Sequence, residues 1–239
     1  MKKTALFLYI LTLVCSCTKE AKLNFTEQHI ETSEVAEISI VYPKAEGSKN
    51  LIDNINSPIE DYIVNQINFS EDAQTKLSID DAVAKFNYEF KNFKNDFPDS
   101  AQQWEALIGG EVTYQSPEII TIAINSYLDT GGAHGNTNVR FFNFDPQTGR
   151  LLTKKDLISN LSAFSKEVKR RLAEEMKTED NPDFEDLFFG KDFELPESLG
   201  YSDEGLIILY NPYEIASYAQ GIIEFTIPFE TIDSYLKLN

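Results

Sequence analysis

Cysteine is scarce in this chain of 239 residues, and its two copies, Cys15 and Cys17, both lie close to the N-terminus. A disulfide framework, a thiolate metal site and a cysteine nucleophile in the body of the protein are therefore excluded. Hydrophobic residues make up 42% of the chain and aromatic residues 12%. Stability must then come from an ordinary hydrophobic core, and the chain is long enough to build one or two close-packed domains.

Basic residues are also few, because 21 Lys and Arg stand against 39 Asp and Glu and leave a formal charge of −18. We expect no nucleic-acid partner, since phosphate binding needs basic patches that release counterions. An acidic surface attracts cationic partners and speeds their approach. Acidity that only keeps the protein soluble is the favoured explanation, and a specific cationic ligand is the alternative.

Long apolar sequence is rare, and the clearest run extends from Ala5 to Val14, after Lys2 and Lys3. This run is too short to span a bilayer, which takes about 20 apolar residues. Its charged start and short apolar body predict a signal peptide over residues 1–16.

The residue before each cysteine decides where the signal is cleaved. Ser16, before Cys17, is small, whereas the branched Val14 before Cys15 fits a small-residue cleavage pocket poorly. We expect Cys17 to become the lipidated first residue, and two or more acyl chains anchor a protein stably to a membrane. The sequence thus predicts a lipid-anchored protein of the cell envelope, on the periplasmic or outer side of the outer membrane. Residues 17–33 are expected to form a tether that leaves His29 exposed.

The first half of the chain predicts a strand, two helices and then further strands. A strand over residues 35–42 is expected to end at Pro43, and a helix over residues 51–67 is interrupted by Pro58, so that it either kinks or starts anew at Ser57. A second helix follows a possible cap at Ser78. Its apolar stripe, which we expect to face the core, consists of Ile79, Val83, Phe86, Phe90, Phe93 and Phe97.

Short connections then separate strands over residues 104–108, 111–115, 119–128 and 139–144, which predicts an antiparallel meander. A helix through residues 161–176 with a basic outer face, strands over residues 205–210 and 222–227, and a short helix from Pro228 complete the chain. The predicted fold is α+β, with antiparallel sheets, packed helices and two closely associated subdomains at residues 34–137 and 138–239.

The glycine-dense loop within residues 127–136 holds most of the candidate site residues, which are Asp129, Gly131, Gly132, His134 and Asn136. Leu128-Asp-Thr-Gly131 reproduces the short core of aspartic proteases, but one copy needs a dimer to supply the second carboxylate. We favour Asp129 as a turn residue. His134 could act as a general base or a metal ligand, but a metal site needs three or four ligands. A histidine that hydrogen-bonds the backbone of a tight loop is the favoured interpretation.

A second loop, over residues 211–221, carries Tyr213 and Tyr218. Tyrosine offers a large rigid face with a polar tip and is frequent at contact sites. Rings that merely cover the edge of a sheet are the favoured alternative.

Several short motifs together resemble one family. They are Thr130-Gly-Gly-Ala-His-Gly-Asn136, Phe142-Asn-Phe-Asp-Pro-Gln-Thr-Gly149, Leu152-Thr-Lys-Lys-Asp-Leu157, Asn211-Pro-Tyr-Glu-Ile-Ala-Ser-Tyr-Ala-Gln-Gly221 and Ile227-Pro-Phe229. The chain resembles the paired extracellular domain of the family that includes the anti-sigma factor RsiV and the peptidoglycan deacetylase PdaC, from about Val35 onward. The catalytic domain of the deacetylase and the membrane-spanning and sigma-binding parts of RsiV have no counterpart in it.

The resemblance implies binding and does not imply catalysis. The expected partner is a basic protein such as lysozyme, which RsiV recognises, or peptidoglycan, and we expect no cofactor and no metal. Two alternatives stay open: a hydrolase centred on His134 and Asp129, and a structural envelope component without a small ligand.

Overall fold

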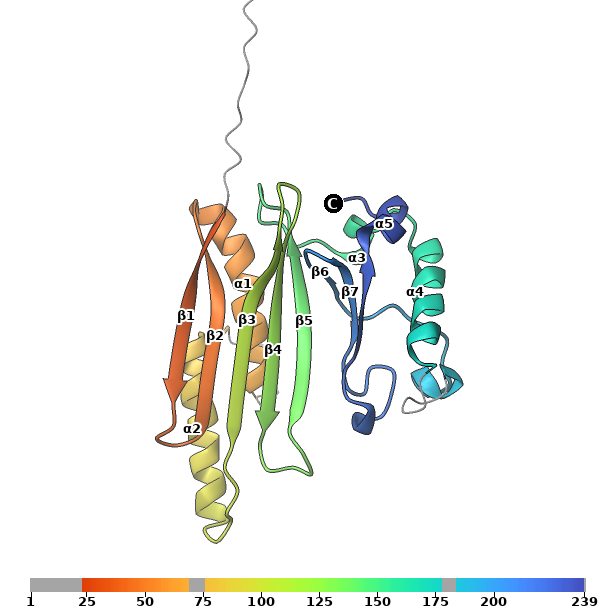
Figure 1. Cartoon of the computed structure of the whole chain (residues 1–239). Helices are drawn as coiled ribbons and strands as arrows, with labels where there is room; N and C mark the ends of the chain where they lie inside the picture. Colours follow the sequence, from red (N-terminus) through yellow and green to blue (C-terminus); the bar gives the residue numbers. More distant parts are fainter. Residues whose placement is uncertain (1–22, 69–75, 178–183, 239) are drawn as a thin grey trace, which may run out of the picture.

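The computed structural model describes residues 23–68, 76–177 and 184–238 (Figure 1). The predicted signal peptide and Cys17 lie outside these described residues. The α+β class is confirmed, because helices pack against one five-stranded and one three-stranded sheet.

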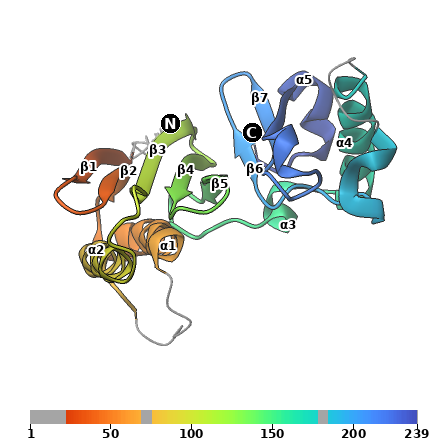
Figure 2. The same ribbon diagram turned by 90° about the horizontal axis from the view of Figure 1, so that it is seen from below.

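The N-terminal unit is built on the five-stranded sheet, with its strands in the order β1-β2-β3-β4-β5. These strands are β1 (Asn24–Thr32), β2 (Glu37–Glu46), β3 (Glu105–Gln115), β4 (Ile120–Asp129) and β5 (Asn136–Phe144). All neighbours are antiparallel except β2 and β3, which are parallel. A parallel pair needs a long crossover, and α1 (Lys49–Ile67) and α2 (Ile79–Asp96) supply it. Both helices cover the same face of the sheet (Figure 2).

The start of α2 and its buried stripe agree with the sequence. The Ser78 side chain accepts from the Asp81 N–H, and the Asp81 side chain accepts from the Ser78 N–H, so a capping box begins the helix. Phe86 and Phe90 are buried in the core. Phe97 departs from the stripe, because it is the C-cap residue and its side chain is 58% exposed.

Two prolines do not end the elements in which they stand. α1 continues through Pro58, so a new start at Ser57 is wrong. Ile55, Ile59 and Ile63 are fully buried around this position, and their packing offsets the hydrogen bond that proline removes. β2 likewise continues through Pro43 to Glu46, although pairing with β3 stops at Val41. Because β2 no longer pairs with β3 beyond Val41, the N–H group that Pro43 lacks is not needed for a hydrogen bond to β3.

The predicted tether is also wrong over most of its length. Residues 24–32 form β1, which pairs with β2 from Asn24 opposite Glu46 to Thr32 opposite Ile38. Phe25 and Ile30 pack against the core, and this burial holds the segment in the sheet. His29 lies in β1 rather than in a linker, and its side chain is exposed beside Glu27.

Glycine does not separate the two strands predicted over residues 104–115. Gly109 and Gly110 lie inside one long strand, β3. A Cβ atom at Gly110 would stand 2.6 Å from Ile124 Cδ1 of the neighbouring strand. Glycine is therefore required by close packing at this point and does not break the strand.

The C-terminal unit contains the three-stranded sheet, in which β6 (Leu199–Tyr201), β7 (Gly205–Tyr210) and β8 (Ile223–Pro228) are antiparallel. Its helices are α3 (Lys154–Leu157), α4 (Leu161–Glu175) and α5 (Phe229–Ile232), with 3₁₀ turns η1 (Phe184–Gly190), η2 (Tyr218–Gln220) and η3 (Asp233–Tyr235). Phe164, Val168 and Leu172 of α4 are fully buried. The outer face of α4 is less basic than its sequence suggests, because Arg170 pairs with both Glu167 and Glu174.

The predicted boundary after residue 137 cuts through β5, which belongs entirely to the first sheet. As the predicted meander implies, β5 pairs with β4, from Asn136 opposite Leu128 to Phe144 opposite Ile120. The first sheet therefore extends to Phe144.

Buried polar side chains join the two units. Thr121 Oγ1 donates to Asn143 Oδ1 at 2.7 Å, and Asn143 Nδ2 donates to the carbonyl of Leu199 in β6 at 2.8 Å. Farther along β5, the N–H of Phe141 donates to Ser198 Oγ at 3.0 Å. The outer edge of β5 is thus satisfied by the C-terminal unit, and the loops of the two units are held side by side.

Candidate binding site

The loop between β4 and β5 is shaped by one carboxylate and one glycine. Asp129 Oδ1 accepts from the N–H of Gly131 at 2.8 Å, which is an Asx turn. Gly131 has a φ of +85°, a conformation open to glycine, and its carbonyl accepts from Gln102 Nε2 at 2.6 Å. Asp129 therefore lies in the turn as expected.

His134 lies against Tyr218 of the C-terminal unit. The two rings stack with centroids 3.5 Å apart and an interplanar angle of 14°. His134 Nδ1 lies 2.9 Å from the Gly135 carbonyl, and the Tyr218 hydroxyl donates to the same carbonyl at 2.8 Å. Gly135 has no room for a side chain, because a Cβ atom would stand 2.4 Å from the Tyr127 ring.

Both ring nitrogens of His134 have polar neighbours. A carbonyl oxygen only accepts, so Nδ1 donates in the contact with the Gly135 carbonyl. The hydroxyl of Tyr213 lies 3.4 Å from Nε2. The imidazole is thus oriented by groups on both sides.

Tyr213 and His134 are the exposed members of this group. Tyr213 is 54% exposed, and its φ of +68° is unusual for a bulky residue. Its ring centroid lies 5.8 Å from that of Tyr218. Backbone strain of this kind is often retained at functional sites. We refer to His134, Tyr213 and Tyr218 as the aromatic cluster.

The sequence analysis missed the residue that holds the tyrosine loop in place. Asn211, directly after β7, is buried, and its side-chain Oδ1 accepts from the Val139 N–H at 2.7 Å. Its Nδ2 donates to the Val139 carbonyl at 3.0 Å. The amide therefore pairs with the edge of β5 as a neighbouring strand would. The available signal was the Asn-Pro-Tyr motif, in which a polar residue immediately follows an apolar strand.

Glu214 fixes the same loop from the other side. Its carboxylate accepts from the N–H groups of Asn211 at 2.9 Å and Glu197 at 2.7 Å. Burial raises the pKa of Glu214, and these backbone hydrogen bonds oppose the rise. The loop conformation is thus set by buried polar contacts to both units.

The other predicted site residues do not join the aromatic cluster through a described contact. Asn136 is exposed and begins β5 opposite Leu128, and Gly132 is exposed in the loop. Asp129 and His134 are each engaged with different backbone groups. The arrangement offers a platform for contact and, within the described residues, does not pair a base with a nucleophile.

Within residues 23–68, 76–177 and 184–238, no group of three or more His, Cys, Asp or Glu side chains is placed to hold a metal ion. No helix in the same ranges is long and apolar enough to cross a bilayer.

The comparisons with known proteins agree with the two-part fold. Residues 30–137 match the family model "Deacetylase PdaC", and residues 151–230 match "Protein of unknown function (DUF3298)". The chain is 29% identical over 135 residues to the anti-sigma-V factor RsiV of Bacillus subtilis (strain 168). This match covers 53% of the chain and 46% of RsiV, so the chain spans about half the length of that relative.

Two crystal structures of DUF3298 family proteins share the fold. The protein from Bacteroides fragilis has a TM-score of 0.63 at 19% identity, and the protein from Pseudomonas aeruginosa PAO1 has a TM-score of 0.60 at 20% identity. Each match covers 90% of this chain and 93% of the solved chain. The chain is therefore similar to the PdaC family over residues 30–137, to DUF3298 over residues 151–230, and to RsiV over 135 residues.

Proposed function

We propose that this protein is a non-catalytic binding module of the cell envelope and that its partner is a basic, lysozyme-like protein or a cell-wall glycan. The exposed aromatic cluster is the observation that carries the proposal. Tyrosine rings with fixed orientation contribute much contact area at low cost in side-chain entropy. The relation to an anti-sigma factor supports a protein ligand.

Charge favours the basic protein over the glycan. The formal charge of −18 attracts a cationic protein over long range and speeds its approach. A neutral glycan would gain nothing from this field. We therefore expect binding to weaken steeply as salt is added, because screening shortens the reach of surface charge.

The N-terminus gives the proposed location. A lipid on Cys17 would tether the two domains to the envelope membrane, where β1 begins after only a short segment. Metabolic labelling with an alkyne fatty acid tests this step. Cys17→Ser should lose the label and Cys15→Ser should keep it.

Calorimetric titration of residues 18–239, which include every described residue, tests the partner. The titrants are lysozyme and, separately, solubilised peptidoglycan fragments, each at low and moderate salt. Saturable lysozyme binding that weakens with salt supports the proposal for a protein partner. Glycan binding alone indicates a wall-attachment module, and no binding of either overturns the proposal.

One substitution links the binding to the aromatic cluster. Tyr213→Asn removes the exposed ring, and asparagine tolerates a positive φ better than tyrosine does. We expect lysozyme affinity to fall about 30-fold, the size of a typical hot-spot loss of about 2 kcal/mol. Tyr88→Asn on α2 removes a tyrosine that is 61% exposed and should leave affinity unchanged.

A further inference from the structure

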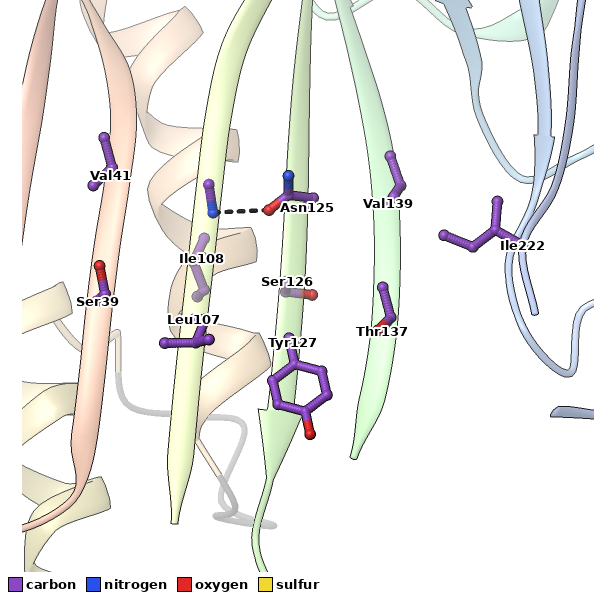
Figure 3. A pocket seen from close by; sticks show the side chains of 11 residues that line it. Ser39, Val41, Leu107, Ile108, Asn125, Ser126, Tyr127, Thr137, Val139 and Ile222 are labelled. Carbon is purple, nitrogen blue, oxygen red and sulfur yellow. Dashed lines mark hydrogen bonds between the residues drawn. The ribbon is translucent and has the colours of Figure 1, made fainter. Parts of the chain in front are cut away.

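The face of the five-stranded sheet opposite α1 and α2 carries a groove. A hollow of about 560 Å³ lies over β2, β3, β4 and β5 and is bounded on the far side by Ile222, next to β8 (Figure 3). This volume falls within the range of known ligand pockets, roughly 300–1,000 Å³. Its apolar lining includes the aliphatic side chains of Val41, Leu107, Val139 and Ile222 and the ring of Tyr127.

The hollow continues in both directions. A second hollow of about 410 Å³ shares Gly109, Asn125 and Val139 with it and reaches Glu111 and Glu224. A third, of about 420 Å³, shares Thr137 and Ile222 with it and ends beside Tyr218. We call the three together the sheet groove. Its elongated form suits an extended chain better than a compact small molecule.

The floor of the sheet groove is apolar and accessible. Leu107 and Ile222 are each 36% exposed. Gly109 contributes no side chain, and its N–H donates to Asn125 Oδ1 at 3.0 Å, which fixes the amide at the centre of the floor (Figure 3). Burying such aliphatic side chains against an apolar residue of a partner is favourable.

Carboxylates flank this floor. The only charged side chains that line the three hollows are Glu111 and Glu224. On the same face of the sheet, strand register places Glu37 opposite Glu105 and Glu105 opposite Asp129. Like charges on directly opposite strand positions repel one another. A cationic ligand would relieve that repulsion, so charge complementarity points to lysine or arginine in the occupant.

The aromatic rings near the groove argue against a sugar as that occupant. The Tyr127 ring lies directly against Gly135, and the Tyr218 ring is stacked on His134. Both rings already use a face for contacts within the protein. Of the other apolar side chains that line the groove, Phe141 is buried and the rest are aliphatic. A groove with an aliphatic floor and acidic flanks matches a peptide that alternates apolar and basic side chains.

We propose that the sheet groove binds an extended cationic segment of a partner protein. Separate apolar side chains of the segment pack against Leu107 and against Ile222. Its basic side chains pair with Glu111 and Glu224 at one end and with the Glu37–Glu105–Asp129 row at the other. The proposal goes beyond the function proposed above, because it assigns a second contact surface, which meets the aromatic cluster at Tyr218 and takes an extended segment.

The test measures binding of two fluorescently labelled synthetic peptides to residues 18–239 by fluorescence anisotropy. In one peptide lysine and valine alternate, and in the other glutamate replaces every lysine. We expect saturable binding of the lysine peptide alone. Leu107→Gln should weaken it about tenfold, the loss expected from one partly buried leucine. Leu151→Gln is the matched control, since Leu151 is 38% exposed and lies outside the groove.

Charge variants provide a second readout. Glu224→Gln should weaken binding of the lysine peptide and reduce its salt dependence, whereas the exposed Glu230→Gln should not. Equal binding of the glutamate peptide, or unchanged affinity in Leu107→Gln, would overturn the proposal. So would displacement of the lysine peptide by soluble peptidoglycan fragments, which would make the groove a glycan site.

The two proposals fail independently of each other. Tyr213→Asn removes a residue that does not line the sheet groove, so it should leave peptide binding intact while lysozyme binding is lost. Loss of peptide binding in Tyr213→Asn, with an unchanged unfolding midpoint, would contradict the assignment of two separate surfaces.

Discussion

At the scale of single residues, the aromatic cluster depends on a few polar side chains that satisfy backbone groups. Asn211 pairs with both the N–H and the carbonyl of Val139, and Gly135 offers one carbonyl to His134 and Tyr218. Buried backbone groups without partners are costly, so each of these side chains is needed for a specific reason. Because these side chains hold the loop, the exposed Tyr213 can keep a strained backbone conformation with positive φ.

Asn211→Ala should destabilise the protein by about 2 kcal/mol, because it leaves the partly buried N–H and carbonyl of Val139 without their side-chain partner. Urea denaturation gives the free energy of unfolding. Asn136→Ala, at an exposed position on the same strand as Val139, should change this free energy by less than about 0.5 kcal/mol. Equal effects of the two substitutions would refute the role of Asn211.

At the scale of secondary-structure elements, two capping boxes set where helices start. Ser78 and Asp81 begin α2, and Thr153 and Asp156 begin α3 just after the turn that connects the two units. The Asp156 carboxylate accepts from the Thr153 N–H at 2.8 Å and from its hydroxyl at 2.7 Å. These contacts fix the first turn of α3, and the N–H of Leu152, just before it, donates to the carbonyl of Asn143 in β5 at 2.7 Å.

Ser78→Ala should cost about 1 kcal/mol, the usual cost of losing an N-cap side chain. The expected effect is confined to α2, because Ser78 is exposed and caps that helix alone. Hydrogen exchange measures it: the first-turn amides of α2 should exchange faster while those of α4 are unchanged. Equal acceleration in both helices would indicate global destabilisation instead.

The capping of α3 predicts a pH dependence. Hydrogen bonds from Thr153, together with Arg150, lower the pKa of Asp156 from 3.8 to about 2. A carboxylate whose pKa is lowered in the folded state stabilises the protein above its unfolded pKa, and this stabilisation is lost as pH falls through the folded pKa. The difference in unfolding midpoint between the native protein and Asp156→Asn should therefore shrink between about pH 4 and about pH 2. A constant difference over this range would contradict the assignment.

At the scale of the whole molecule, the two units have separate hydrophobic cores but share a polar seam. Thr121, Asn143 and Leu199 form its buried part, and Arg140 pairs with Glu197 at 2.9 Å at its surface. The aromatic cluster and the sheet groove both draw residues from the two units. Binding at either surface therefore depends on the seam.

The seam should make the two units unfold together. Fluorescence of Trp104, which packs on the first core, and exchange of the β7 amides should give the same midpoint in urea. Asn143→Ala breaks the Thr121–Asn143–Leu199 chain, and we expect the two midpoints to separate in this variant. Separate midpoints already in the native protein would show that the units are not coupled.

The sequence by itself determined the α+β class, the capped start and buried stripe of α2, the strand β7 and the helical end after Pro228, because local periodicity and capping chemistry encode them. It also pointed to the two loops that carry His134, Tyr213 and Tyr218. It did not determine that residues 24–32 form a strand, because this polar segment lacks clear periodicity. Nor did it determine that β2 and β3 are parallel, because this pairing joins segments separated by α1 and α2. Only the tertiary structure brought His134 against Tyr218 and placed Asn211 on the edge of β5. Contacts between residues more than seventy positions apart have no local signal in the chain.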